Sequence, residues 1–442
     1  MPASSLLSTG GAPAPGAPPD IRQWNGSAVV NATACGQALG IPTVAMMFLT
    51  VDEVFHEPTW RLWYQHAADL VPASSVVCNG TAVNATCDCD RARLAGLREL
   101  CRPQDKAPVL QRQHLFNVYI HSRPEYAFPE DSIFFGREIA ERSKVEWGTH
   151  QLVDATKALL RAALRQPLNQ KFILLSESHI PLYSPMLVYQ QLMSEPTSRL
   201  DSWGLQPTDL RRWTQRLVHN DFNHGSWRKS SQWFALRRDH AQAVVQDTVL
   251  NDKFAEHCKN GFDSELNRWR DCFSDEHYIP SLIAYLQRGH ETDGFGRLVH
   301  VVWENWDVHP KSFSPKEVTL QTFRQMRGDG APCHTHQVDI REVKRMFVPA
   351  KRITPATCQR AAPSYNQTLR PQCPLLARKF PRDTVMPLFK LVRDCSNGLA
   401  IVNDGSCRKI LGMRGRQLLG SPRPSAQEVR RWQEHRHLQN GR

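Results

Sequence analysis

Two short segments of the chain carry residues that can perform group-transfer chemistry. Ser-Asp-Glu-His-Tyr at 274–278 places a carboxylate at the start of an expected helix, and Ala-Arg-Lys-Phe at 377–380 supplies a cation much later in the chain. A carboxylate base can remove the proton from an acceptor hydroxyl, and a fixed positive charge can stabilise a departing diphosphate. Transfer of a sugar from a nucleotide-sugar needs both kinds of group, and Glu276 and Lys379 are candidates for them, but neither segment is decisive alone.

Each of these residues also has an ordinary structural explanation. An acidic side chain in a first helical turn stabilises the helix dipole, so Glu276 needs no catalytic role to be there. Asp275 is expected to be a cap or an orienting partner rather than a second catalyst. Arg378 and Lys379 can be a solvated basic pair ahead of a helix expected over 381–392. The chemical interpretation therefore depends on the rest of the chain.

Length and charge limit the class of protein. The chain has 442 residues, 41% of them hydrophobic, which is enough for one large domain or two. The net charge of +12 favours anionic partners such as phosphate-bearing donors or a membrane surface. Nucleic acid is not the expected partner, because zinc-finger, RNP and helix-turn-helix patterns are absent from the sequence. We expect a flexible stem over 1–40, a folded domain over 41–400 and a basic, disordered tail over 401–442.

The cysteines and glycosylation sequons indicate an oxidising compartment. The chain has 12 cysteines, and four of them, Cys78, Cys87, Cys89 and Cys101, lie in the segment 71–113. Asn-X-Ser/Thr sequons begin at Asn25, Asn31, Asn79, Asn84 and Asn366. We interpret 71–113 as a disulfide-tied insertion in a secretory lumen. A zinc site is the weaker alternative, because Cys87 and Cys89 are too close in sequence for a usual ligand pair.

The sequence does not show how the chain would reach that compartment. Residues 1–20 lack a signal-peptide pattern, and the longest apolar run, 41–51, is shorter than the roughly 20 residues that span a bilayer. We therefore expect a lumenal, membrane-associated protein whose anchor is not visible here. The alternative is a cytosolic protein whose sequons are accidental.

Apolar runs alternate with helical patterns through the first half of the chain. Strand-length runs occupy Thr43–Thr50, Leu115–Ser122 and Lys171–Ser176, and helical spacing occupies Glu57–Leu70 and Gln151–Arg165. Alternation of this kind predicts an α/β domain around a mostly parallel sheet. Later in the chain we expect a strand over 232–236, one helix over about 239–250 and a helix from Ser274 through Leu286.

Ligands in such sheets bind beyond the carboxyl ends of the strands. The candidate cleft residues at these ends are His121, Ser122, Glu146, Trp147, Ser176, Glu177 and His179. Trp227 and Trp233 are candidates for an acceptor platform, because aromatic faces suit sugar rings, and Asp275 is grouped with them. Most tryptophans are nevertheless expected in the core. Arg211, Arg212 and Arg216 are interpreted as a solvated helix face, with contact to the acceptor as the less favoured alternative.

No metal or cofactor is expected. The only Asp-X-Asp triplet, at 88–90, lies within the cysteine-rich segment and is interpreted as part of a loop. Glu177 and His179 offer one carboxylate and one imidazole, which is a poor ligand set for Mg²⁺ or Mn²⁺.

Taken in order, these segments resemble a known family. The chain is similar to the core-2/I-branching β-1,6-N-acetylglucosaminyltransferases (glycosyltransferase family 14), particularly the plant and algal branch. The matching stretches span about four-fifths of the chain and are 44–50, 119–122, 145–148, 172–182, 227–234, 275–278, Trp306 with 309–310, and 376–380.

The resemblance implies a GT-A-like fold and a metal-independent, inverting transfer from a UDP-sugar to a glycan hydroxyl in the Golgi lumen. It assigns the general base to Glu276 and the diphosphate contacts to Lys379 and Arg352, with Arg378 as a spare. This chain departs from the animal members by having Ser122 where they carry Asp. N-acetylglucosamine is the expected sugar, with glucuronic acid and xylose left open.

Two other functions stay open at this point. One is a catalytically silent carbohydrate- or nucleotide-sugar-binding protein on the same fold. The other is a glycosidase, which is less favoured because no second carboxylate is clearly paired with Glu276 at the required spacing.

Overall fold

The computed structural model describes residues 32–76, 91–102, 106–204, 210–293, 297–304, 309–328, 346–352, 373–394, 399 and 401–402. The asparagines of all five sequons and nearly all of the predicted tail lie outside these ranges. None of the helices in the described ranges combines the length and the apolar character needed to cross a bilayer.

The main sheet has six strands in the order β12-β6-β9-β4-β1-β3. β1 lies parallel to both β3 and β4, whereas β9 runs antiparallel to β4 and β6. All seven residues of β1 are buried, as expected for a strand covered on both faces. The strands are β1 (Thr43–Leu49), β3 (Phe116–His121), β4 (Asn169–Leu175), β6 (Ser198–Arg199), β9 (Ala235–Arg237) and β12 (Thr292–Asp293).

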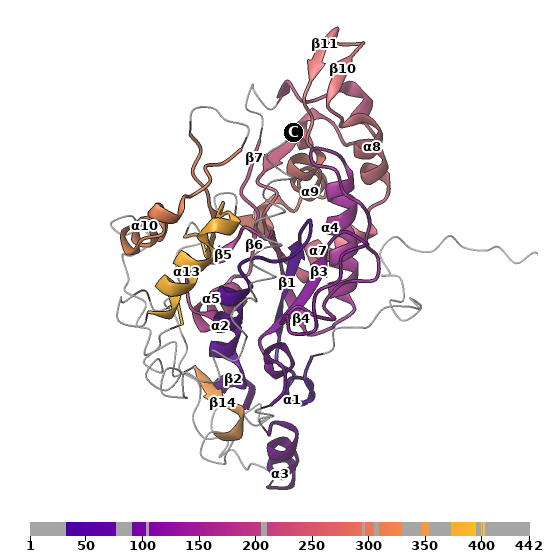
Figure 1. Ribbon diagram of the computed structural model, residues 1–442. Helices are drawn as coiled ribbons and strands as arrows, with labels where there is room; N and C mark the ends of the chain where they lie inside the picture. Colours follow the sequence, from indigo (N-terminus) through magenta and orange to yellow (C-terminus); the bar gives the residue numbers. More distant parts are fainter. Residues whose placement is uncertain are drawn as a thin grey trace, which may run out of the picture.

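Helices cover both faces of this sheet (Figure 1). α4, α7 and α9 pack together on one face, and α2, α5 and α13 on the other. The helices are α1 (Ala34–Ala38), α2 (Glu57–Ala67), α3 (Arg91–Leu100), α4 (Gln151–Leu164), α5 (Pro185–Ser194), α7 (Arg238–Gln246), α8 (Val249–His257), α9 (Ser274–Tyr285), α10 (Leu320–Met326) and α13 (Val385–Arg393).

Smaller sheets lie around the main one. β15 pairs with β13 and β5, and the other small sheets are the pairs β2-β14, β7-β8 and β10-β11. Their bounds are β2 (Leu70–Pro72), β14 (Phe347–Pro349), β5 (Ile180–Pro181), β13 (Val299–His300), β15 (Leu376–Ala377), β7 (Ser202–Gly204), β8 (Arg228–Ser230), β10 (Gly261–Asp263) and β11 (Arg268–Arg270).

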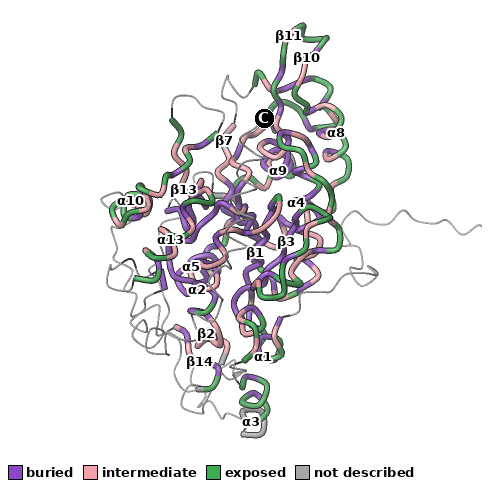
Figure 2. Tube along the Cα trace, in the orientation of Figure 1, coloured by how far each residue is buried: buried purple, intermediate pink, exposed green. Residues whose placement is uncertain are grey.

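The core is centred on β1 and its neighbours, where Figure 2 shows the densest buried trace. The apolar stripe of α2 is aromatic: Trp60, Trp63 and Tyr64 are fully buried against this core. Trp63 also donates its indole N–H to the Tyr183 carbonyl at 2.9 Å, so its polar atom is satisfied inside the protein. The α/β architecture predicted from the sequence is confirmed.

Two local predictions were wrong. The helix expected over 239–250 is two helices, because the Asp247 carboxylate accepts the backbone N–H groups of Leu250 (3.2 Å) and Asn251 (2.9 Å) and begins α8 there. The Val145–Gly148 segment, expected to end a strand, is irregular and ends in a turn. Gly148 has φ +78°, and a Cβ on it would lie 3.2 Å from the Asn260 amide.

The N-terminal boundary of the domain also differs from the prediction. Residues 32–40 were expected to belong to a flexible stem, but they include α1 and join the folded domain. Buried Cys35 forms a disulfide with Cys101, one of the four clustered cysteines. The other three cysteines of that cluster lie outside the described residues. A second disulfide joins Cys258 to Cys272.

Candidate active site

Glu276 lies in the first turn of α9, where two cations hold its carboxylate. Arg212 Nη1 is 2.8 Å from Glu276 Oε2, and Lys229 Nζ is 3.2 Å from the same oxygen. The Glu276 side chain remains 26% exposed, so water and a ligand can reach it. Lys229 comes from β8, which packs along α9, and Arg212 comes from a loop more than sixty residues before the helix. The predicted base is therefore an accessible carboxylate in a positive surrounding.

Asp275, immediately before it, is in a different environment. Burial, followed by the negative charge of Glu276, raises the pKa of Asp275 to about 7. Among the described residues, no group donates a hydrogen bond to its buried Oδ1. Two adjacent carboxyl groups thus differ in exposure and partners, which separates their roles.

His277 and Trp227 form the support beneath this turn. Their rings stack with centroids 4.2 Å apart, and the His277 Nδ1 atom is 2.7 Å from the Arg228 carbonyl oxygen. Burial lowers the pKa of His277 to about 3, so the ring is neutral. Trp227 is fully buried, and no face of its ring is open to a sugar. The acceptor-platform role predicted for Trp227 is therefore replaced by a packing role.

The second predicted segment lies against the Glu177–His179 turn. β15 pairs antiparallel with β5, and the Phe380 N–H donates to the Ser178 carbonyl at 3.2 Å. This pairing brings Arg378 and Lys379 to the end of β4, where the cleft residues were predicted. The Glu177–His179 turn and the 377–380 segment are about two hundred residues apart in the sequence, so only the fold brings them together.

Arg378 is fixed by an aromatic side chain. Its guanidinium lies 4.6 Å from the centroid of Trp233, and burial lowers its pKa to about 10 while Glu177 opposes this. Arg378 Nε is buried and, within the described ranges, has no acceptor. Trp233 is itself almost buried, so it packs here rather than presenting an open platform to an acceptor.

Glu177, Ser176 and His179 complete this cluster. Burial raises the pKa of Glu177, and the charges of Arg378 and Lys379 act in the opposite direction. His179 Nδ1 lies 2.9 Å from both the backbone N–H and the Oγ of Ser176. Its ring contacts Trp233 at 4.5 Å, and burial lowers its pKa. Glu177, Arg378 and Lys379 are half-buried, so the cluster is a partly accessible patch with an excess of cations, suited to an anionic ligand.

The segment from Lys229 to Trp233 connects the two clusters. Lys229 contacts Glu276, and Trp233, four residues later, contacts Arg378. Four residues of extended chain span at most about 14 Å, so this short segment links the base to the cationic cluster.

A second path joins the same clusters from the other side. Trp147, 61% exposed, contacts the rings of Phe273 (5.5 Å) and His309 (5.1 Å). Four residues after His309, the Phe313 N–H donates to the Lys379 carbonyl at 2.9 Å. Since Phe273 precedes α9, the contacts form a closed ring from Glu276 through Trp147 to Lys379.

Other predicted cleft residues are engaged elsewhere. Ser122 Oγ accepts from Arg142 Nη1 at 2.8 Å, and His121 Nε2 accepts from the Ser143 N–H at 3.2 Å. Burial lowers the pKa of His121 to about 4. Glu146 is exposed and its backbone N–H donates to the Gln151 side chain. The side chain of Arg352 lies outside the described part of the structure.

Sequence reasoning missed the two cations on Glu276. Arg212 was interpreted as part of a solvated face, yet it pairs with the predicted base. Its position in the sequence gives no sign of this, because the contact depends on the fold. Lys229 could have been found, since it lies between Trp227 and Trp233 in a stretch already singled out.

Two further features lie away from the ring of contacts. The ligand atoms of Asp239, His240 and Glu291 lie within 4.8 Å of one another, but Arg237 and Arg288 pair with the two carboxylates and balance their charge. A cavity of about 350 Å³ lies beside the second half of α9 and is lined by Leu200, Ser202, Arg228, Pro280, Ile283 and Gln287, among others.

The mixed sheet and its helical layers are the architecture of an α/β glycosyltransferase fold. The chain belongs to the core-2/I-branching enzyme family: the family model, described as Core-2/I-Branching enzyme, matches residues 98–327. These residues include Glu276 and both of its cations, but not Lys379.

A curated relative supports the same family. The chain is 33% identical over 213 residues to a protein of rice (Oryza sativa subsp. japonica) named Glycosyltransferase BC10. The similarity covers 43% of this chain and 50% of the rice protein, so the chain spans about half the length of the relative it matches.

Proposed function

We propose that the protein is an inverting glycosyltransferase that moves N-acetylglucosamine from a UDP-sugar to a glycan hydroxyl. The closed ring of contacts carries this proposal, because it links an accessible carboxylate to a cationic cluster. The family and the name of the rice relative support the same reaction class.

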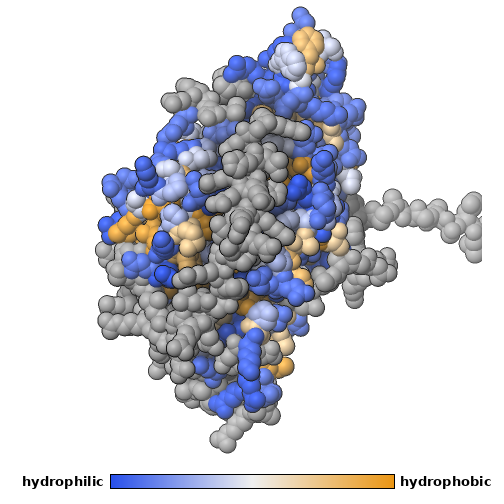
Figure 3. Space-filling model, viewed as in Figure 1, coloured by the Kyte–Doolittle hydropathy of each residue, from blue (hydrophilic) through white to orange (hydrophobic). Residues whose placement is uncertain are grey.

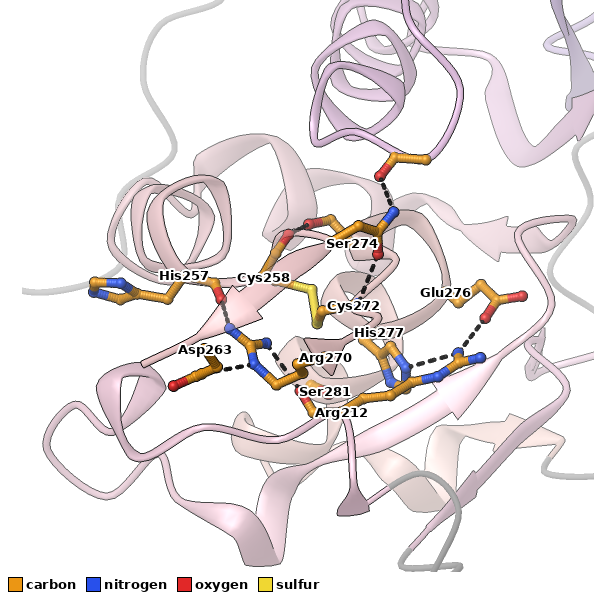
Figure 4. Close-up of a disulfide and its surroundings, with 12 residues drawn as sticks. Arg212, His257, Cys258, Asp263, Arg270, Cys272, Ser274, Glu276, His277 and Ser281 are labelled. Carbon is orange, nitrogen blue, oxygen red and sulfur yellow. Dashed lines mark hydrogen bonds and ion pairs between the residues drawn. A yellow bond between two sulfur atoms is a disulfide. The ribbon is translucent and has the colours of Figure 1, made fainter. Parts of the chain in front are cut away.

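The proposed base is the Glu276 carboxylate. The closest contact of each cation is to Oε2, and we assign Oε1 as the atom that accepts the proton of the attacking hydroxyl. Figure 4 shows the Glu276 carboxylate projecting away from α9 with one oxygen directed at Arg212. Fixed in this way, the carboxylate needs little reorganisation when the acceptor attacks.

The proposed leaving-group site is the pair Arg378 and Lys379. Their positive charges would stabilise the negative charge that develops on the departing UDP, and Trp233 holds the Arg378 guanidinium in place. Two side-chain cations can supply the charge that a divalent ion supplies elsewhere, so we propose a metal-independent transfer. Glu177 and His179 would line the donor side of the site.

A panel of UDP-sugars tests this proposal. Purified protein is incubated with UDP-N-acetylglucosamine, UDP-glucuronic acid or UDP-xylose, a mixture of glycan acceptors, and either EDTA or Mn²⁺, and UDP release and product mass are measured. The proposal predicts acceptor-dependent UDP release from UDP-N-acetylglucosamine that EDTA leaves unchanged. Glycan or UDP binding without any UDP release would instead identify a catalytically silent binding protein.

We further propose that the protein acts in the Golgi lumen in association with the membrane. The support is chemical: the disulfides Cys35–Cys101 and Cys258–Cys272 persist in oxidising compartments. Expression of the tagged protein followed by glycosidase treatment and membrane fractionation tests this. A mass shift on removal of N-glycans and co-sedimentation with Golgi markers are expected, and an unshifted protein in the cytosolic fraction would contradict the proposal.

A further inference from the structure

A disulfide-bracketed hairpin immediately precedes the helix that carries Glu276. β10 and β11 form this hairpin, and the Cys258–Cys272 disulfide closes it at its base, two residues before α9 begins. The hairpin projects from the molecule (Figures 1 and 3). Phe262 and Trp269 lie opposite each other in the middle of its strands, and Trp269 is 76% exposed. The face that carries Asp263 and Arg270, by contrast, is buried.

Arg270, on the buried face of this hairpin, uses all three of its nitrogen atoms. Its Nε binds the Asp263 carboxylate at 3.0 Å, its Nη2 donates to the His257 carbonyl at 2.6 Å, and its Nη1 donates to the Arg212 carbonyl at 3.1 Å. Asp263 is also buried, so the pair is shielded from solvent. A planar guanidinium with several fixed acceptors holds its neighbours in one geometry.

The contact with Arg212 connects the hairpin to the proposed base. Arg270 binds the Arg212 carbonyl. The Arg212 side chain lies over the Phe273 ring at 5.2 Å, and its Nη1 is 2.8 Å from Glu276 Oε2. The neighbouring Arg268 donates to the Arg211 carbonyl at 2.9 Å, so the hairpin holds this loop at two consecutive residues. Figure 4 shows the path from Asp263 through Arg270 and Arg212 to Glu276 beside the disulfide.

We propose that Arg270 is a positioning residue for the reaction: it fixes the Arg212 backbone so that the Arg212 side chain orients the Glu276 carboxylate. The inference rests on the proposed function, because orientation matters only if Glu276 acts as the base. This role would also explain how the disulfide-bracketed hairpin contributes to the reaction, because the hairpin carries Arg270. Misplacement of a reacting group by about 1 Å is enough to lower a rate by about 100-fold.

Conservative substitutions test this role without removing the buried charge. Arg270→Lys keeps a cation beside Asp263 but cannot reach the His257 and Arg212 carbonyls together. Arg216→Lys is the matched control, because Arg216 pairs with Glu265 on the same hairpin at 2.9 Å and does not contact Arg212. Arg212→Gln, Arg212→Lys and the double variant R270K/R212Q complete the set, and melting temperatures verify folding.

We expect the substitutions at Arg270 and Arg212 to lower kcat and to leave the KM for the UDP-sugar almost unchanged. R270K lowers kcat by about 10- to 100-fold while the KM for the UDP-sugar changes less than about twofold, and R216K stays near the wild-type rate. R212Q lowers kcat at least as much, R212K restores part of it, and R270K/R212Q is no slower than R212Q alone, because both changes act through one side chain.

Two results would overturn the inference: a folded R270K protein with wild-type kcat, or effects of R270K and R212Q that multiply in the double variant. If R270K does not fold, the Arg212 variants decide alone, and an unchanged kcat in R212Q rejects the role. Failure of the proposed function has a different signature, since the wild-type protein itself would then transfer no sugar from any donor.

Discussion

The buried carboxyl of Asp275 should make the stability of the protein fall as the pH rises. Its pKa is raised from an ordinary 3.8 to about 7, so between these values the folded state holds a proton that the unfolded state has lost. Stability contributed by this proton is complete below pH 3.8 and is lost as the pH rises through about 7. Asp275→Asn removes the titration while keeping the shape of the side chain.

The magnitude follows from the difference between the two pKa values. A difference of about three pKa units corresponds to about 4 kcal/mol over the full range, of which about 2 kcal/mol falls between pH 5.5 and 7.5. Urea unfolding of both proteins at these two pH values measures it. We expect the stability of D275N relative to wild type to increase by about 2 kcal/mol from pH 5.5 to 7.5.

The comparison has a clear control and a clear refutation. Asp131→Asn changes an exposed loop carboxyl in the same way and controls for the substitution itself. A stability difference between D275N and wild type that is the same at both pH values would show that Asp275 titrates alike in the folded and unfolded states. The reasoning from its burial and from the charge of Glu276 would then be wrong.

Two further predictions concern the donor side and the disulfides. Trp233→Ala removes the ring beneath Arg378 and should raise the KM for the UDP-sugar by about 2- to 10-fold, whereas Trp233→Phe should recover part of the affinity; an unchanged KM in steady-state kinetics would separate Arg378 from the donor. Replacing Cys258 and Cys272 by serine opens a loop with a sequence separation of 14 and should lower the free energy of unfolding by about 3 kcal/mol. Replacing Cys35 and Cys101, which are 66 residues apart, should lower it by about 4 kcal/mol. Urea unfolding of the two double variants should reveal that order.

Elements with strong periodicity could be predicted from the sequence. β1, α4 and α9 begin within a residue of where the apolar spacing placed them, because burial on a sheet or helix face dictates that spacing. The break between α7 and α8 could not be predicted in this way. It depends on hydrogen bonds from the Asp247 side chain, which leave the apolar pattern unchanged.

The candidate site was only partly predictable for a related reason. Segments such as 227–234 and 376–380 stood out in the sequence, but a sequence does not show which side of a strand or turn faces the ligand. Trp227 is therefore a buried support, while Lys229, two residues later, contacts Glu276. Arg212 left no signal at all, because its role arises from a contact made across the fold.

The most direct test of the account is sugar transfer by the Glu276→Gln variant, which keeps the size of the side chain and removes its basicity. Transfer from the active UDP-sugar and UDP affinity are measured on the same preparation, with Glu265→Gln as a control on the nearby hairpin. We predict that E276Q loses transfer by about 100- to 10,000-fold while UDP binds as in wild type. Wild-type turnover in a folded E276Q protein would contradict the assignment of the base.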